Sequence, residues 1–194
     1  MKKFLAALTV AFILASSNFA EAIPFSRTQL DKIFFEVEQI PAPNSTFDLN
    51  AETLKEKFNG IITPILKDAV GTDNLSAIEH LFLIKNYKIF SKPTGDIFAN
   101  MFGDYRVAII GTGATGENFK VLNFYYTTPE EKDESIFTVW LLTAFVKSIA
   151  PEVNPQTLMN DLTAENSSGS VVAGGVKFSV TSEGNLNVLT AIRN

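Results

Sequence analysis

The stretch that most constrains what this chain can fold into is residues 104–126, DYRVAIIGTGATGENFKVLNFYY. Its first half is an apolar run that leads into G-x-G-x-x-G at Gly111, Gly113 and Gly116, the spacing of a dinucleotide-binding turn. A dinucleotide site needs a helix directly after the glycines, because the pyrophosphate binds at the N-terminus of that helix. Residues 118–127 are instead rich in aromatic and β-branched side chains and predict a second strand. We therefore expect a β-hairpin here and no nucleotide cofactor.

The glycine-rich turn is also the first candidate for a ligand site. Successive backbone N–H groups in such a loop can form a nest for a small anion. The ligand-binding candidates at this turn are Gly111, Thr112, Gly113, Thr115 and Gly116. A further candidate is Trp140, the single tryptophan, on a segment that could cover an apolar cavity. The alternative for Trp140 is a place in a filled core.

The most hydrophobic segment after the N-terminus is residues 135–150, SIFTVWLLTAFVKSIA. A helix that is apolar on nearly all sides is typical of the centre of a fold, and Pro151 ends it. Upstream, residues 28–40 have apolar side chains at helical spacing, with a strand as the alternative. Asn50 caps another predicted helix, which Pro64 ends or kinks.

Strand patterns occupy the rest of the chain. They are expected at residues 81–90, 97–102, 105–110 and 118–127, and in a closing hairpin over 175–192, with a short helix opened by Asn154 between the two sets. Simple alternation in the fourth strand places Phe119 on the face of Tyr125, opposite Leu122 and Phe124. Segregated runs of helices and strands predict an α+β fold, with an antiparallel sheet and helices packed on one face. A helix followed by strands occurs twice, which allows two pseudo-repeated halves.

The N-terminus predicts export. Lys2 and Lys3 precede an apolar run, and Ala20-Glu21-Ala22 is an A-x-A cleavage pattern, so residues 1–22 are expected to be a cleavable signal peptide. The apolar run is shorter than the roughly 20 residues that span a bilayer. We expect no stable membrane insertion after cleavage. Residues 23–194 would then form a single domain in the periplasm or outside the cell.

Composition excludes several classes of function. The chain has no cysteine, which removes thiol nucleophiles, disulfides and zinc–thiolate sites. Its net charge is −5 and it has no basic run, which disfavours nucleic-acid binding. His80 is the only histidine, so a histidine-based catalytic triad or zinc site is not expected.

Carboxylates provide the remaining catalytic hypothesis. Asp96, Asp104 and Glu117 all fall at predicted turns between strands, where two of them could act as an acid and base pair in hydrolysis. The acidic residues of 130–134 lack the spacing of a calcium loop and are interpreted as a solvated helix start, so no metal site is predicted.

The chain loosely resembles small exported bacterial α+β domains of unknown function. The resembling features are Leu54, Phe58 and Asn59, the apolar helix ending in Ala150-Pro151, and the strand GVKFSV over residues 175–180. The resemblance implies no catalytic residues. The function we expect is a non-catalytic binding domain of the bacterial cell envelope, with a protein partner or a small ligand; the alternative is a small secreted hydrolase using carboxylates at the strand turns.

Overall fold

The computed structural model describes residues 24–39, 44–114, 116–128, 134–164 and 167–194. The predicted signal peptide, residues 1–22, lies outside them. A single sheet holds all seven described strands, and every neighbouring pair is antiparallel. The strands are β1 (Lys88–Lys92), β2 (Gly95–Phe102), β3 (Val107–Gly113), β4 (Phe119–Thr127), β5 (Ser170–Ala173), β6 (Val176–Glu183) and β7 (Leu186–Arg193). This arrangement confirms the predicted α+β fold with an antiparallel sheet.

The strand order, β1-β2-β3-β4-β7-β6-β5, divides the sheet into two meanders that meet at their last strands. Helices α3 (Ala51–Val70) and α4 (Leu75–Phe82), joined by the short η1 (Thr72–Asn74), precede β1 to β4. Helices α5 (Glu134–Ile149) and α6 (Pro155–Thr163) precede β5 to β7. Each half therefore runs from helices into a meander, as the pseudo-repeat expectation allowed.

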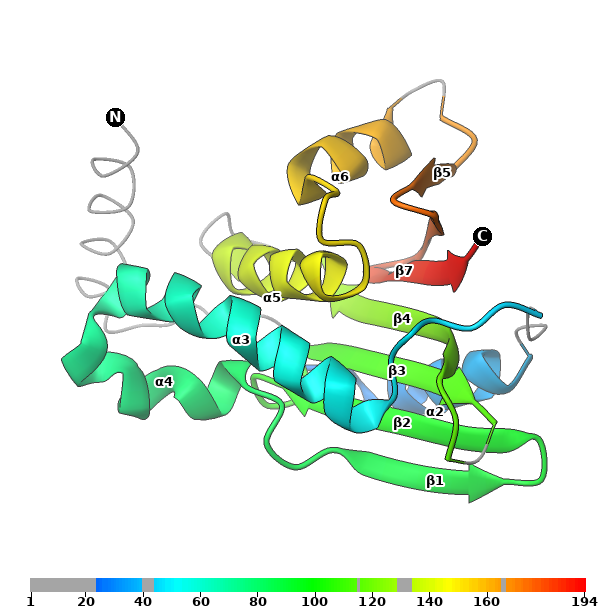
Figure 1. The fold of residues 1–194 in the computed structure, drawn as a ribbon, viewed down its shortest axis with the longest axis horizontal. Helices are drawn as coiled ribbons and strands as arrows, with labels where there is room; N and C mark the ends of the chain where they lie inside the picture. The colour runs from blue at the N-terminus through cyan, green and yellow to red at the C-terminus, as the bar shows by residue number, and fades with distance from the viewer. Residues whose placement is uncertain (1–23, 40–43, 115, 129–133, 165–166) are drawn as a thin grey trace.

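Helices cover the two faces of the sheet unequally. Helices α3, α5 and α6 lie on one face, and α2 (Arg27–Gln39) lies behind the sheet in Figure 1, on the other. The first three follow the expected placement, whereas α2 adds a helix to the opposite face. Residues 28–39 are thus helical, which settles the helix-or-strand alternative for that segment.

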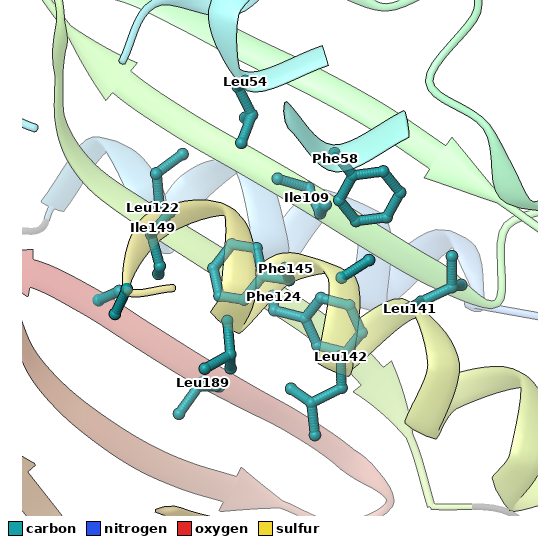
Figure 2. Packing of buried hydrophobic residues seen from close by; sticks show 14 of the residues in the cluster. Leu54, Phe58, Ile109, Leu122, Phe124, Leu141, Leu142, Phe145, Ile149 and Leu189 are labelled. Atoms are coloured by element: carbon teal, nitrogen blue, oxygen red, sulfur yellow. The ribbon is translucent and has the colours of Figure 1, made fainter. Parts of the chain in front are cut away.

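The larger core lies between α3, α5 and the sheet. Figure 2 shows Phe145 of α5 beside Phe124 of β4, with ring centroids 5.4 Å apart. Both side chains are fully buried, as are Leu54 and Phe58 of α3 and Leu189 of β7. The apolar helix predicted at residues 135–150 is therefore central, and side chains fill the space beneath it. Within the described residues, no helix is both long and apolar enough to cross a membrane.

The smaller core lies under α2. Ile33 and Val37 of the helix pack against Ile97, Ile110 and Tyr125 of the sheet. The Tyr125 side chain is only 1% exposed. Burial, with a smaller contribution from the Glu36 carboxylate, raises the pKa of Tyr125 far above its usual value.

This burial makes the fold sensitive to alkali through Tyr125. Above about pH 10 the unfolded chain loses the tyrosine proton while the folded chain retains it, so this residue lowers the free energy of unfolding by about 1.4 kcal/mol per pH unit. The Tyr125→Phe variant lacks that contribution. Its free energy of unfolding should therefore fall less steeply than that of the wild type between about pH 10 and 11.5. Urea unfolding at stepped pH measures both slopes. Equal slopes would contradict the assignment.

Two local expectations are wrong. The first is an end at Pro64: helix α3 continues past this residue to Val70, because Leu66, Ala69 and Val70 are buried and their burial outweighs the lost hydrogen bond, a cost of about 3 kcal/mol. The strand expected over residues 81–90 starts only at Lys88. The preceding apolar residues have helical spacing, and Phe82 of α4 packs into the larger core. In addition, β5 was not predicted.

Candidate functional site

The glycine-rich stretch forms a hairpin. Strand β3 ends at Gly113 and β4 begins at Phe119, so the backbone after Gly116 enters a strand and not a helix. The two strands pair antiparallel from Val107↔Tyr126 onward. Without a helix after the glycines, the turn lacks the pyrophosphate site of a dinucleotide-binding fold.

Packing and turn geometry account for the three glycines. A Cβ on Gly111 would lie 2.7 Å from the Phe119 ring, so glycine lets that ring lie over β3. A Cβ on Gly113 would lie 2.7 Å from the Asn118 carbonyl oxygen, at a register shift between Thr112 and Gly113. Gly116 has a φ of 72°, a conformation that favours glycine.

The register shift also corrects the predicted faces of β4. It places Phe119 in the same core cluster as Leu122 and Phe124, whereas simple alternation had placed Phe119 with Tyr125. A β-bulge inserts one extra residue into a strand and thereby changes which face the neighbouring side chains occupy. The ring of Phe119 is thus available to line a pocket on the α3 side of the sheet.

That pocket, of about 300 Å³, lies where the hairpin turn meets the start of α3. Its lining comes from residues 50–52 at the start of α3, from Ile89, Asp96 and Phe98 of β1 and β2, and from Gly113, Ala114, Gly116, Glu117 and Phe119 of the turn and β4. The structure therefore brings part of the predicted ligand-binding turn into a concave site. Gly111 and Thr112 lie in β3, and Thr115 lies outside the described residues.

The pocket combines aromatic rings with carboxylates. The rings of Phe98 and Phe119 meet edge-to-face with centroids 5.5 Å apart. The carboxylates of Glu52, Asp96 and Glu117 line the same space. The Gly116 amide donates to Asp96 Oδ2 at 3.3 Å, so this amide of the turn already has a carboxylate of the protein as its acceptor.

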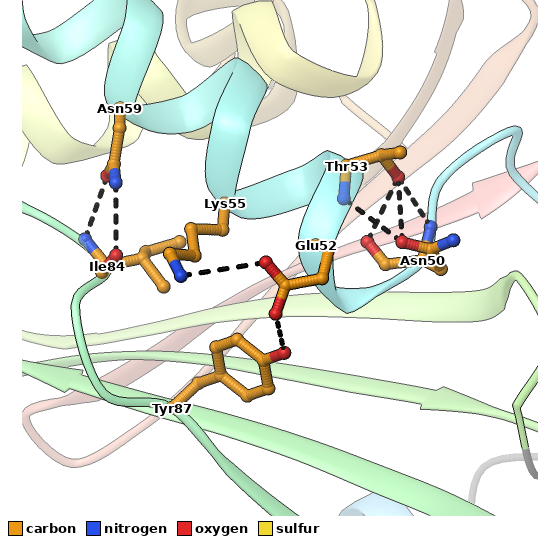
Figure 3. Close-up of polar contacts among 7 residues, drawn as sticks. All are labelled: Asn50, Glu52, Thr53, Lys55, Asn59, Ile84 and Tyr87. Carbon is orange, nitrogen blue, oxygen red and sulfur yellow. Dashed lines mark hydrogen bonds and ion pairs between the residues drawn. The ribbon is translucent and has the colours of Figure 1, made fainter.

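A small polar network connects α3 to the segment before β1 (Figure 3). The Tyr87 hydroxyl donates a hydrogen bond to the Glu52 carboxylate, and Lys55 Nζ lies 3.6 Å from the other oxygen of Glu52. The hydrogen bond from Tyr87, with a smaller contribution from Lys55, lowers the pKa of Glu52 below its usual value. The same hydrogen bond raises the pKa of Tyr87. At neutral pH the Tyr87 hydroxyl therefore keeps its proton as the donor, and the Glu52 carboxylate is ionised as the acceptor.

Two further contacts fix this end of the molecule. Asn50 and Thr53 form a capping box at the start of α3, with 3.0 Å between Thr53 N and Asn50 Oδ1. The Asn59 side chain bonds both backbone groups of Ile84, at 2.9 Å and 3.0 Å. Because Ile84 lies just ahead of β1, these bonds hold the approach to the edge strand against α3 (Figure 3). Asn59, one of the residues that carry the family resemblance, therefore has a structural role.

Other sequence candidates lie elsewhere. Trp140 of α5 packs against Phe82 of α4, with centroids 5.9 Å apart, and does not line the pocket. Asp104 is in the turn between β2 and β3, at the opposite end of β3 from Gly113, with a φ of 54°. His80 is exposed on α4. Among the described side chains, no group of three His, Cys, Asp or Glu residues is placed to hold a metal; residues 130–133 are not described.

The sequence patterns did not reveal an exposed apolar surface at the β1 edge of the sheet. Strand β1 is an edge strand with all five residues exposed, including Ile89 at 45% and Phe90 at 43%. The Phe90 ring meets the Phe34 ring of α2 edge-to-face at 5.7 Å, and Phe35 is 63% exposed. The sequence signal for this edge strand was the alternation of Lys, Phe and Lys in KIFSK, residues 88–92. A single strand over residues 81–90 does not separate this segment from the helical residues before it.

Comparison of the chain with protein-family models, curated proteins and solved structures finds no match.

Proposed function

We propose that this chain is an exported, non-catalytic binding domain of the bacterial cell envelope that recognises a protein partner along β1. The observation that carries the proposal is the exposed edge strand, with Ile89 and Phe90 each more than two-fifths exposed. Proteins normally protect such edges, because the unpaired backbone groups can pair with another chain. An edge strand with large apolar side chains, beside a pocket, is suited to a partner.

Export is supported by the N-terminal pattern of residues 1–22, with its basic start, apolar run and A-x-A motif. The protein is expected to mature at Ile23 and to work in the periplasm or outside the cell. The absence of cysteine is compatible with either, because a chain of this length can bury enough surface to fold without disulfides.

Site-specific photo-crosslinking in the native cell tests the proposal. A photoreactive phenylalanine analogue at Phe90 is expected to give a discrete adduct in the exported fraction. The matched control is the same analogue at Val172, which is 56% exposed on β5, the opposite edge of the sheet. Equal labelling at both positions, no adduct at Phe90, or retention of residues 1–22 in the mature protein would each contradict the proposal.

A second candidate is the hydrolase with carboxylates at strand turns. It is favoured by one observation, that Asp96 and Glu117 line the same pocket, with Asp104 at the far end of β3. If the pocket is catalytic, Asp96→Asn and Glu117→Gln should each reduce hydrolysis of a chromogenic glycoside panel at least a hundredfold, whereas Asp104→Asn should leave it unchanged. Absence of turnover by the purified wild-type protein across that panel counts against this candidate.

A further inference from the structure

We infer that β1 binds an extended segment of another protein as an added strand, and that this segment carries an acidic, an apolar and an acidic residue at alternate positions. The inference deepens the proposed function and rests on it. It follows from three features of β1: the direction of its backbone groups, the side chains on its two faces, and its charge relative to the rest of the chain.

Among the described strands, β1 pairs only with β2, so its other side is the edge of the sheet. β1 and β2 are joined by the two-residue turn Pro93-Thr94, and Lys92 pairs with Gly95 at its base. Hydrogen-bonded and non-hydrogen-bonded pairs alternate along an antiparallel ladder from such a turn. Lys92, Phe90 and Lys88 therefore direct their backbone groups to β2. Ile89 and Ser91 direct theirs outward, where a partner strand would pair.

The side chains of β1 divide by face. Lys88, Phe90 and Lys92 share the α2 side of the sheet, because their partners in β2 are Ala99, Ile97 and Gly95. The contact with Phe34 holds the Phe90 ring on that side. An added strand places its own side chains about 5 Å from these, so its residues on this face would meet Lys, Phe and Lys in turn.

The other face of the added strand meets a different environment. Ile89 lines the pocket that also contains Glu52, Asp96 and Glu117. Three carboxylates disfavour acidic side chains on this side. The acidic residues of the segment are thereby directed to the α2 face, where they lie opposite Lys88 and Lys92. The residue between them on that face lies opposite Phe90 and is apolar.

Charge also distinguishes this occupant from a second copy of the chain. The whole chain carries a net charge of −5, yet β1 carries two lysines and no acid. In a symmetric antiparallel pairing centred on Phe90, Lys88 of each copy would face Lys92 of the other. Like charges directly opposite each other destabilise a strand pair, and edge lysines are a common protection against self-association. An acidic partner segment has the complementary charge.

The test uses two capped heptapeptides, TETVTET and its charge-reversed match TKTVTKT, titrated into the mature protein and followed by amide NMR shifts. TETVTET should shift amides of β1 and bind at least tenfold more tightly than TKTVTKT at low salt, with the difference shrinking at high salt. Lys88→Glu should reduce or reverse the preference.

Proline provides the control for strand addition. Ser91→Pro removes an outward N–H while leaving the β1–β2 pairs in place, since proline is tolerated on an edge strand with its nitrogen toward solvent. It should abolish peptide binding, and Ser91→Ala should bind within twofold of wild type. Melting temperatures confirm that both variants fold.

Equal affinity for the two peptides, binding that survives Ser91→Pro, or a wild-type dimer that Ser91→Pro dissociates would each overturn the inference. A crosslinked partner at Phe90 without peptide selectivity overturns this inference alone and leaves the proposed function standing.

Discussion

Phe145→Ala is expected to lower the free energy of unfolding by about 3–5 kcal/mol, the range for removing a buried aromatic ring from a core. Phe145 is fully buried between α5 and the sheet, and its ring contacts Phe124 at 5.4 Å between centroids. The large cavity left behind cannot collapse easily, because Phe145 belongs to a core cluster to which α3, α5 and the sheet all contribute buried side chains. Urea denaturation followed by circular dichroism measures the change.

The matched control for Phe145 lies on the same helix. Val139 is 48% exposed, so Val139→Ala should change the free energy of unfolding by no more than about 0.5 kcal/mol. If the two substitutions cost the same, α5 is not the central helix of this fold. A loss below about 1 kcal/mol at Phe145 leads to the same conclusion.

Gly95→Ala is the second substitution with a large expected effect, a loss of about 2–4 kcal/mol. A Cβ at Gly95 would lie 2.1 Å from the carbonyl oxygen of Gly113, on the neighbouring strand β3. Gly95 also has a φ of 131°, a conformation that other residues rarely adopt. The clash is with backbone, so a side-chain rotation cannot relieve it. The β1–β2 turn would have to move away from β3.

Gly60→Ala is the control for Gly95→Ala. Gly60 is in the interior of α3, and a Cβ there would meet no atom within 4 Å. Alanine should raise the free energy of unfolding by about 0.5–1 kcal/mol, because glycine is the weaker helix former. Thermal unfolding of both variants gives the comparison. If Gly95→Ala is as stable as wild type, the close approach of the two hairpins is incorrect.

Much of the fold was predictable because hydrophobic spacing records which face of an element is buried. The α5 helix, the β3–β4 hairpin and the β6–β7 hairpin follow directly from such spacing and from turn residues. Prediction failed where burial competed with a local rule. Pro64 stays inside α3 since the residues after it are buried, and the bulge near Gly113 turns Phe119 to the other face.

The candidate site was only partly predictable. The glycine turn was singled out from its spacing, and the structure places Gly113 and Gly116 in a pocket wall. Trp140 was singled out for its chemistry and lies in another part of the fold, against Phe82. Glu52, Ile89 and Phe98 had no local signal, because their contribution depends on which distant segments meet at the end of α3.

The sequence by itself determined that this chain folds as antiparallel strands with a central apolar helix, and that its glycine motif is a turn, because periodicity and turn chemistry act over a few residues. Only the tertiary structure decided that α2 covers the second face, that β1 is an exposed edge, and that acids from three segments share one pocket. The physical reason is that strand order and long-range packing join residues far apart in the chain, and short-range spacing carries no information about which of them meet.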